Sequence, residues 1–322
     1  MRRLGVIGTM VWDTIWRKPR VGPPVEEWGG ISYALAAADA VTPLTYRVRP
    51  VIKLGRDLAE RGFQFLRELS VIETNETVAV VDAPNPRVEL HYAGTERRCE
   101  RLRGGVPAWN WAELAPRIDG CDALYVNFII GNEFDLAMAK QLRRHFDGPI
   151  YADIHSLMLT TGPRGRRRAQ PLERWSEWLA CFDAVQLNEV ELGLLSADWG
   201  DPWAFAADAV GRETRLLFVT LGAGGSAYVM APNALPLEGP KREGARRGRG
   251  LVRTGRLEVQ AVEGGDPTGC GDVWGITAFS ALIAGKDVEE AMRLANAAAR
   301  SNVLHVGATG LNRFLKGEIE SG

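Results

Sequence analysis

The sequence predicts an α/β protein of three layers, in which a mainly parallel sheet lies between helices and carries a small antiparallel β lid. Short apolar runs rich in Val, Ile, Leu and Tyr alternate with amphipathic segments of helical length. This alternation is typical of a parallel sheet that is covered on both faces. It continues through most of the 322 residues, 46% of which are hydrophobic, so we expect a single domain over residues 1–322.

Six apolar runs are the strand candidates, and four longer segments between them are helix candidates. The strand candidates are Leu4–Thr9, Val48–Leu54, Ala123–Phe128, Ile150–Ile154, Ala184–Leu187 and Leu216–Leu221. The helix candidates are Ile31–Ala40, Leu58–Leu69, Glu133–Phe146 and Trp203–Arg212.

Two segments break the alternation and predict the lid. Asp13–Trp16 directly follows the first strand, and the turn-forming Asp82–Pro86 joins two short apolar runs, Thr77–Val81 and Val88–Tyr92, as in a hairpin. We therefore place lid segments near residues 13–28 and 77–105. A flap that closes over a site excludes water from it, although a surface hairpin without a role fits the pattern equally well.

Composition favours small molecules as ligands. With 39 Lys and Arg against 40 Asp and Glu, the formal charge is −1, so we expect neither a nucleic acid nor a membrane as a partner. The four cysteines are too far apart for a compact metal site and suit a reducing cytoplasm. The segment Met1–Gly8 has the pattern of a buried strand rather than a secretory signal, and no apolar run is long enough to span a membrane.

Two segments are rich in arginine. Pro240–Arg256 also contains many glycines and is predicted to be an exposed loop, and the same prediction covers Arg164–Arg168. Neither pattern favours a nucleic-acid arm, because no aromatic residues lie between the arginines to stack on bases. Arg164–Arg168 has the alternative of binding anionic phosphates.

The segment Gly264–Gly275 carries the chemistry. Gly269 and Gly271 allow successive backbone amides to converge on an anion, and the apolar helix that follows adds the positive end of its dipole. Asp272 would lie at the start of that helix, where a carboxylate accepts a proton from an incoming hydroxyl. An ordinary glycine turn with a capping Asp is the alternative, but the longer string with Asp266 and Thr268 favours a functional site.

Asp266–Asp272 resembles the C-terminal signature of the ribokinase-like, or PfkB-type, carbohydrate kinases. The resemblance implies that Asp272 is the catalytic base and that the amides of Gly269, Cys270 and Gly271 form an anion hole. Cys270 stands where the family often has Ala, a small residue that leaves the backbone amide in place.

Further motifs extend this resemblance to the binding of ATP and Mg²⁺. Asn188 and Glu191 match the Asn-x-x-Glu motif that organises magnesium, with Glu191 acting through water, and Thr220, Gly222 and Gly225 match a turn beneath the nucleotide. Asn296 is similarly placed for a nucleotide contact. Each of these motifs alone has an ordinary structural explanation, as a helix cap, a glycine turn or an Ala-rich helix.

For the phosphoryl acceptor, the resemblance points to residues of the N-terminal half. Asp13 matches an Asp that binds substrate hydroxyls, Gly29 and Gly30 match a diglycine, and Asp153 and His155 end a strand that faces the site in relatives. The family usually has an Asn after the diglycine, whereas this chain has Ile31–Leu35 there, so Ser32 or Tyr33 would replace it.

The sequence thus predicts an enzyme that uses ATP and Mg²⁺ to phosphorylate a hydroxyl, preferably a primary alcohol, of a sugar or nucleoside. A need for a monovalent cation such as K⁺ stays open, as does a homodimer through the exposed lid edge. The alternative is a ligand-binding sensor on the same fold, which would not require Asp272. A dinucleotide-dependent oxidoreductase is disfavoured because no G-x-G-x-x-G follows the first strand.

Overall fold

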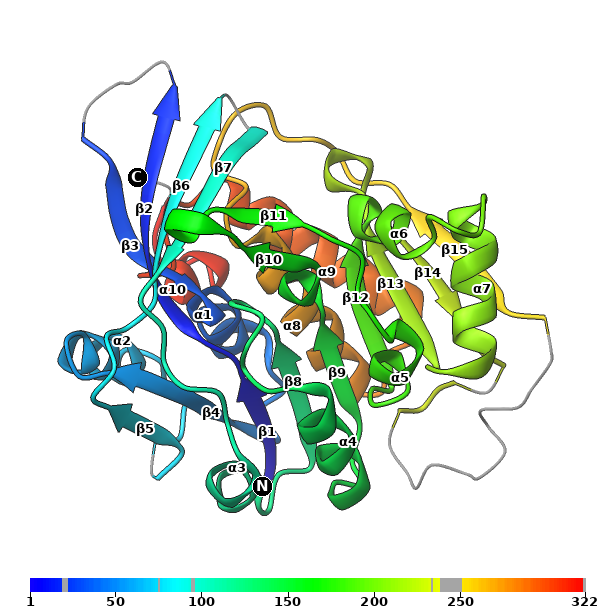
Figure 1. The fold of residues 1–322 in the computed structure, drawn as a ribbon, viewed down its shortest axis with the longest axis horizontal. Coiled ribbons are helices and arrows are strands. Elements are labelled where there is room, and N and C mark those ends of the chain that lie inside the picture. Colours follow the sequence, from blue (N-terminus) through cyan, green and yellow to red (C-terminus); the bar gives the residue numbers. More distant parts are fainter. Residues whose placement is uncertain (19–22, 75, 94–95, 233, 238–250, 321–322) are drawn as a thin grey trace.

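The computed structural model describes residues 1–18, 23–74, 76–93, 96–232, 234–237 and 251–320 (Figure 1). Within these residues a nine-stranded sheet has the strand order β15-β14-β13-β12-β9-β8-β1-β4-β5. Its strands are β1 (Arg2–Ile7), β4 (Tyr46–Gly55), β5 (Val78–Val81), β8 (Ala123–Asn127), β9 (Ile150–Asp153), β12 (Ala184–Asn188), β13 (Leu216–Thr220), β14 (Ser226–Met230) and β15 (Arg253–Leu257). All neighbours are parallel except at one edge, where β14 is antiparallel to both β13 and β15.

Helices cover both faces of this sheet. The described helices are α1 (Ile31–Val41), α2 (Ala59–Arg67), α3 (Trp111–Ile118), α4 (Leu136–His145), α5 (Trp175–Leu179), α6 (Glu189–Leu195), α7 (Pro202–Arg212), α8 (Cys270–Ile283), α9 (Val288–Val303) and α10 (Leu311–Leu315). Short 3-10 helices are η1 (His155–Met158), η2 (Pro163–Gly165) and η3 (Gly222–Gly224).

The two faces form separate hydrophobic cores because side chains alternate along each strand. In β13, Leu216 and Phe218 pack with α1, α8 and α9, whereas Leu217 and Val219 pack with the core that includes α4 and α7. The predicted three-layer α/β fold is therefore confirmed, and the strand and helix candidates lie where the sequence places them, within a few residues at their ends.

A second, four-stranded sheet with the order β3-β2-β6-β7 stands beyond the carboxyl ends of β1 and β8 (Figure 1). It consists of β2 (Met10–Lys18), β3 (Val25–Gly30), β6 (Arg87–Ala93) and β7 (Glu96–Arg103). The pairs β2–β3 and β6–β7 are antiparallel, as predicted for a lid, while β2 and β6 run parallel. Its apolar side chains form a small core with Ile129 and Ile130 of the main body.

The predicted hairpin of Thr77–Val81 and Val88–Tyr92 is wrong. β5 is parallel to β4 in the large sheet, whereas β6 belongs to the small one. The turn between them is a crossover fixed by buried Asn85, whose side chain accepts from Gly55 N at 3.0 Å and donates to Met10 O at 2.9 Å. These bonds tie the turn to both sheets and so separate the two strands.

The two arginine-rich segments also differ from the prediction of exposed loops. Of Pro240–Arg256, residues 240–250 lie outside the described part, and Arg253–Leu257 forms the edge strand β15. In the second segment, Arg167 belongs to β11 (Arg167–Ala169), which pairs with β10 (Leu159–Thr161). Arg167 is buried because its guanidinium donates to acceptors outside this pair, among them Glu100 of β7. No helix among the described residues is long and apolar enough to cross a membrane.

Candidate active site

A cavity of about 650 Å³ lies at the carboxyl ends of the central strands and is bordered by the small sheet. This is where ligands bind in open α/β sheets, and the volume suits a small-molecule ligand. The cavity wall contains all the predicted site residues except Gly29. These are Asp13, Gly30, Asp153, His155, Asn188, Glu191, Thr220, Gly222, Gly225, Gly269, Cys270, Gly271, Asp272 and Asn296.

The glycine turn before α8 has the shape that an anion site requires. Gly269 has φ +78°, and a Cβ added there would lie 2.2 Å from the Tyr33 ring, so only glycine fits. Asp266 fixes the turn by accepting from Thr268 N at 2.9 Å and from Thr268 Oγ1 at 2.6 Å. The 14-residue helix α8 then begins at Cys270 and presents the amides of its first turn.

Cys270 contributes to this turn through its backbone and its packing. Burial raises the pKa of its thiol to about 11, so the group stays neutral, and its Sγ donates to Ala299 O at 3.4 Å. The Cys270 amide donates to Pro267 O at 3.2 Å within the turn and so already has a partner. The side chain therefore anchors the turn to α9.

Asp272 lies in the first turn of α8, where the helix dipole favours a negative charge. Its Oδ1 accepts from Asn127 Nδ2 at 2.6 Å, and Asn127 comes from the carboxyl end of β8. Sequence reasoning missed Asn127, although a polar residue that ends an apolar strand is a usable signal. The bond fixes the orientation of the carboxylate toward the cavity that both residues line.

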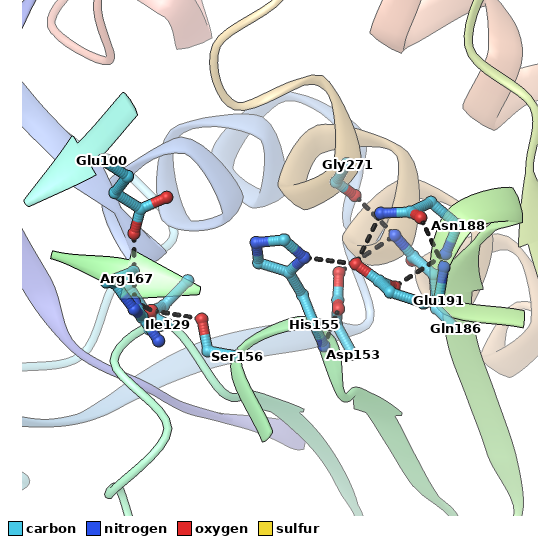
Figure 2. A network of polar contacts seen from close by, with 10 residues as sticks. All are labelled: Glu100, Ile129, Asp153, His155, Ser156, Arg167, Gln186, Asn188, Glu191 and Gly271. Carbon is cyan, nitrogen blue, oxygen red and sulfur yellow. Dashed lines mark hydrogen bonds and ion pairs between the residues drawn. The ribbon is translucent and has the colours of Figure 1, made fainter. Parts of the chain in front are cut away.

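A polar network connects Asp272's helix to the neighbouring strands (Figure 2). Gln186 Nε2 donates to Asp153 Oδ2 and to Gly271 O, both at 3.0 Å, and Gln186 Oε1 accepts from Tyr151 OH at 2.8 Å. Burial, with the nearby Glu191 and Asp272 charges, raises the pKa of Asp153 to about 7. Clustered carboxylates with perturbed pKa values are a feature of functional sites.

Asn188 and Glu191 form a reciprocal cap at the start of α6. Glu191 N donates to Asn188 Oδ1 at 3.0 Å, and Asn188 N donates to Glu191 Oε2 at 2.8 Å. His155 Nδ1 also pairs with the Glu191 carboxylate, so His155 lies beside the predicted metal residue rather than among the predicted acceptor contacts of the small sheet (Figure 2).

The residues present fit Mg²⁺ held largely by phosphates and water. The Glu191 carboxylate lies on the cavity wall, and its oxygens are of the hard type that suits Mg²⁺ directly or through water. Within the described residues no group of three or more His, Cys, Asp or Glu could hold a metal on its own. Mg²⁺ in kinases is characteristically bound by one or two carboxylates together with substrate phosphates, which is what this arrangement offers.

The predicted nucleotide residues Thr220, Gly222 and Gly225 lie at the end of β13 and in the turn to β14, near the edge of the large sheet that is away from the small sheet (Figure 1). Gly225 has φ +87°, and a Cβ there would lie 2.1 Å from Leu257 O, so the backbone approaches β15 closely. Asn296 Oδ1 accepts from Trp274 Nε1 at 2.7 Å and from Ser226 Oγ at 3.0 Å. The Asn296 oxygen thus joins α8, α9 and β14, which places this side chain firmly at the cavity wall.

Of the predicted acceptor residues, Asp13, Gly29 and Gly30 belong to the small sheet, whereas Asp153 ends β9 and His155 begins η1. A Cβ on Gly29 would lie 1.8 Å from Asp13 Oδ2, so the diglycine makes room for the Asp13 carboxylate. Of the two residues predicted to replace the family's Asn, Tyr33 lines the cavity, whereas Ser32 is buried and does not line it. Burial, followed by the charges of Asp13, Asp266 and Asp272, raises the pKa of Tyr33, which keeps its hydroxyl protonated.

Solved structures with the same fold include sugar and nucleoside kinases. A pyrophosphate-dependent kinase in the ribokinase family, in complex with sulfate, is 17% identical with a TM-score of 0.75, and the comparison covers 97% of this chain and 99% of that chain. Arabidopsis thaliana ribokinase with ribose and ATP is 16% identical, with a TM-score of 0.66 and coverage of 98% and 99%. Burkholderia thailandensis nucleoside kinase with inosine is 17% identical, with a TM-score of 0.69 and coverage of 96% and 93%.

At these identities the likeness establishes the fold, so the chain has a ribokinase-like architecture. Its C-terminal part, residues 161–313, matches the model of the pfkB family carbohydrate kinases. No curated protein sequence matches the chain. The chain is thus similar to PfkB-type, ribokinase-like kinases, as the glycine-turn motif predicts.

Proposed function

We propose that this protein is an ATP-dependent kinase that phosphorylates a hydroxyl, preferably a primary alcohol, of a sugar or nucleoside. The observation that carries the proposal is the Asp272 carboxylate in the first turn of α8, next to the glycine turn and held by Asn127 at 2.6 Å. One cavity contains this carboxylate, the Asn188–Glu191 cap and the polar residues of the small sheet. This arrangement supports a base beside an anion site in a cavity that has room for a donor and an acceptor.

In the proposed reaction the acceptor hydroxyl attacks the terminal phosphorus of the donor. A bond forms between the acceptor oxygen and that phosphorus, the bond from phosphorus to the bridging donor oxygen breaks, and the hydroxyl proton passes to Asp272. The Gly269 and Gly271 amides and the dipole of α8 stabilise the transferred group. Mg²⁺ bound near Glu191 would neutralise charge on the donor phosphates, with Glu191 acting through a water.

The donor end supports ATP as the first choice, as in the ribokinase solved with ribose and ATP. A structurally similar protein in the same fold is a pyrophosphate-dependent kinase, so pyrophosphate is the donor to compare with ATP. The acceptor end supports a polyhydroxylated compound, because the Asp13 carboxylate lines the cavity and a carboxylate accepts hydrogen bonds from neighbouring hydroxyls.

The test measures phosphoryl transfer from ATP or pyrophosphate, with and without Mg²⁺, across a panel of sugars and nucleosides. Wild type is compared with Asp272→Asn, and the assays are repeated in potassium and in sodium salts. Loss of the base is expected to lower kcat by about 10²- to 10⁴-fold while donor binding persists. Asp287→Asn, a carboxylate-to-amide change at the exposed cap of α9, is the matched control and should leave turnover unchanged.

Acceptor-stimulated turnover that collapses only in Asp272→Asn would support the kinase and name its substrate class. Wild-type turnover that survives in Asp272→Asn would overturn the assignment of the base. Acceptor or nucleotide binding without turnover across the whole panel would overturn the kinase in favour of a sensor.

A further inference from the structure

The hairpin β10–β11 lies against the edge of the small sheet. Arg101 of β7 and Arg166 form an isolated antiparallel bridge, and Gly165 lies so close to β7 that an added Cβ would be 2.0 Å from Leu102 O. The hairpin follows β9 and η1 in the chain, so a segment from the main body reaches the small sheet next to the cavity.

Arg167 in this hairpin has a side chain that is only 2% exposed. Its Nη1 donates to Glu100 Oε1 and to Ile129 O, both at 3.1 Å (Figure 2). Its Nη2 donates to Ile130 O at 3.2 Å. A guanidinium is planar and rigid, so three acceptors fix its position. Because the group is buried, its charge would be strongly destabilising without these acceptors. Arg167 therefore joins β7 to the segment after β8.

The segment of residues 129–131 is itself held firmly. The buried Glu133 carboxylate accepts from the amides of Ile129, Ile130 and Gly131 at 2.9–3.0 Å. From the other side, Ser156 Oγ donates to Ile129 O at 2.6 Å. Arg167 thus rests on a rigid support and not on a mobile loop.

Glu100, the carboxylate partner of Arg167, lines the same cavity as Asp13 and Tyr92. Glu100 and Asp13 come from different strands of the small sheet, so the acceptor end has two separate carboxylates. A carboxylate accepts hydrogen bonds from hydroxyl or amino groups and repels a phosphate or carboxylate in the same place.

We propose that Glu100 determines acceptor specificity and that Arg167 is the residue that positions it. Glu100 accepts a hydrogen bond from a second hydroxyl or an amino group of the acceptor, beyond those held by Asp13. The acceptor is accordingly a neutral or cationic polyol without an anionic group at its lid-facing end. This inference rests on the proposed kinase function and adds the substrate class.

The experiment compares Glu100→Gln, Arg167→Met and the double variant with wild type. Acceptor binding is measured by calorimetry with the best acceptor of the panel and with its phosphate ester at a hydroxyl other than the reacting one, and KM and kcat are measured with both compounds. Losing a hydrogen bond to a charged group should raise acceptor Kd and KM about tenfold in Glu100→Gln, with kcat and ATP binding within about twofold of wild type. Removing the negative charge should also improve binding of the phosphate ester relative to the neutral acceptor.

If Arg167 acts through Glu100, Arg167→Met raises acceptor KM to a similar extent, and the double variant is no worse than either single variant. Arg167→Lys should recover only part of the loss, because lysine lacks the planar fork of donors. Arg168→Met, at the exposed next residue, is the matched control and should leave KM unchanged.

Three results would overturn the proposal. The specificity role is wrong if Glu100→Gln binds both acceptors as wild type does. This measurement can be made even if Arg167→Met fails to fold. The positioning role is wrong if the two single effects multiply in the double variant. The substrate class is wrong if wild type prefers the phosphate ester. Calorimetric binding without turnover would instead count against the kinase function alone.

Discussion

Asp39 and Asp153 are buried to nearly the same extent, with 4% and 6% of each residue exposed, but in opposite surroundings. Asp39, in α1, accepts from Lys316 Nζ at 2.6 Å, Asn312 Nδ2 at 2.9 Å, Val71 N at 2.8 Å and Ser70 Oγ at 3.0 Å. Asp153, at the end of β9, lies near the Glu191 and Asp272 charges. Asp39 therefore has an ammonium group among its donors, whereas Asp153 accepts from Gln186 Nε2 and His155 N, both at 3.0 Å, but lies beside two other acids.

The pKa values of the two groups move in opposite directions for this reason. Burial tends to raise the pKa of Asp39, but bonds from Lys316 and Asn312 outweigh it and hold the pKa below its usual value. Burial and like charges raise the pKa of Asp153 to about 7. Asp39 therefore stabilises the fold in its ionised form, whereas the folded state disfavours the ionised form of Asp153.

The largest expected effect on stability is that of Asp39→Ala. Removing this carboxylate leaves buried donors on α10 and on residues 70–71 without an acceptor, so we expect a loss of about 3 kcal/mol in the free energy of unfolding at pH 7. Because the folded pKa is depressed, the stabilisation is present above the unfolded pKa of about 3.9 and is lost as pH falls through the folded pKa. Urea denaturation at pH 7 and at pH 3.5 should show a smaller difference in acid.

The control for this variant is Asp147→Ala, in which an exposed aspartate is removed. It should change stability by less than about 0.5 kcal/mol. Equal losses in the two variants would contradict the role of Asp39 as an anchor between α1 and α10.

Asp153→Asn should change the free energy of unfolding in the opposite direction to Asp39→Ala, and by a smaller amount. With a folded pKa of about 7 against about 3.9 when unfolded, Asp153 makes the wild type less stable as pH rises through this window, because the folded state alone retains the proton. Asparagine does not ionise, so the variant should gain about 2 kcal/mol over wild type at pH 8 and little at pH 4.5. Kinase turnover should fall in the same variant.

Thermal and urea unfolding of the ligand-free protein at both pH values measure this difference. A variant that is less stable than wild type at pH 8 would show that Asp153 is a structural acceptor like Asp39. Both aspartates would then stabilise the folded state, and the contrast between them would be wrong.

The separation in the chain between contacting residues explains which features could be predicted from the sequence. The strands, the main helices and the glycine turn follow from patterns within a few residues of one another, and Asp266 in fact contacts Thr268 two residues away. Asn127 and Asp272 are 145 residues apart in the chain, and Asp39 and Lys316 are 277 apart. No local pattern connects such pairs, so Asn127 and Asp39 were not identified.

Other misses have the same physical origin. The predicted hairpin relied on a turn-forming stretch, but buried Asn85 bonds to Met10 across 75 residues and directs the chain into another sheet. Arg167 was assigned to a solvated loop because its acceptor Glu100 is 67 residues away. The sequence did contain signals for the missed residues of the site. Asn127 is a polar residue at the end of an apolar strand, and Gln186 is a polar residue within the apolar strand β12.

The smallest expected effect is that of Lys316→Met, which separates the ion pair from the other bonds to Asp39. The Lys316 side chain is 27% exposed, so solvent screens its charge, and Asp39 keeps the donors of Asn312, Val71 and Ser70. We expect a loss of about 1 kcal/mol in urea denaturation at pH 7, with Lys286→Met, at an exposed position, as the matched control. A loss as large as that of Asp39→Ala would mean that the ion pair alone anchors α10, whereas no loss relative to Lys286→Met would assign the whole anchor to the neutral donors.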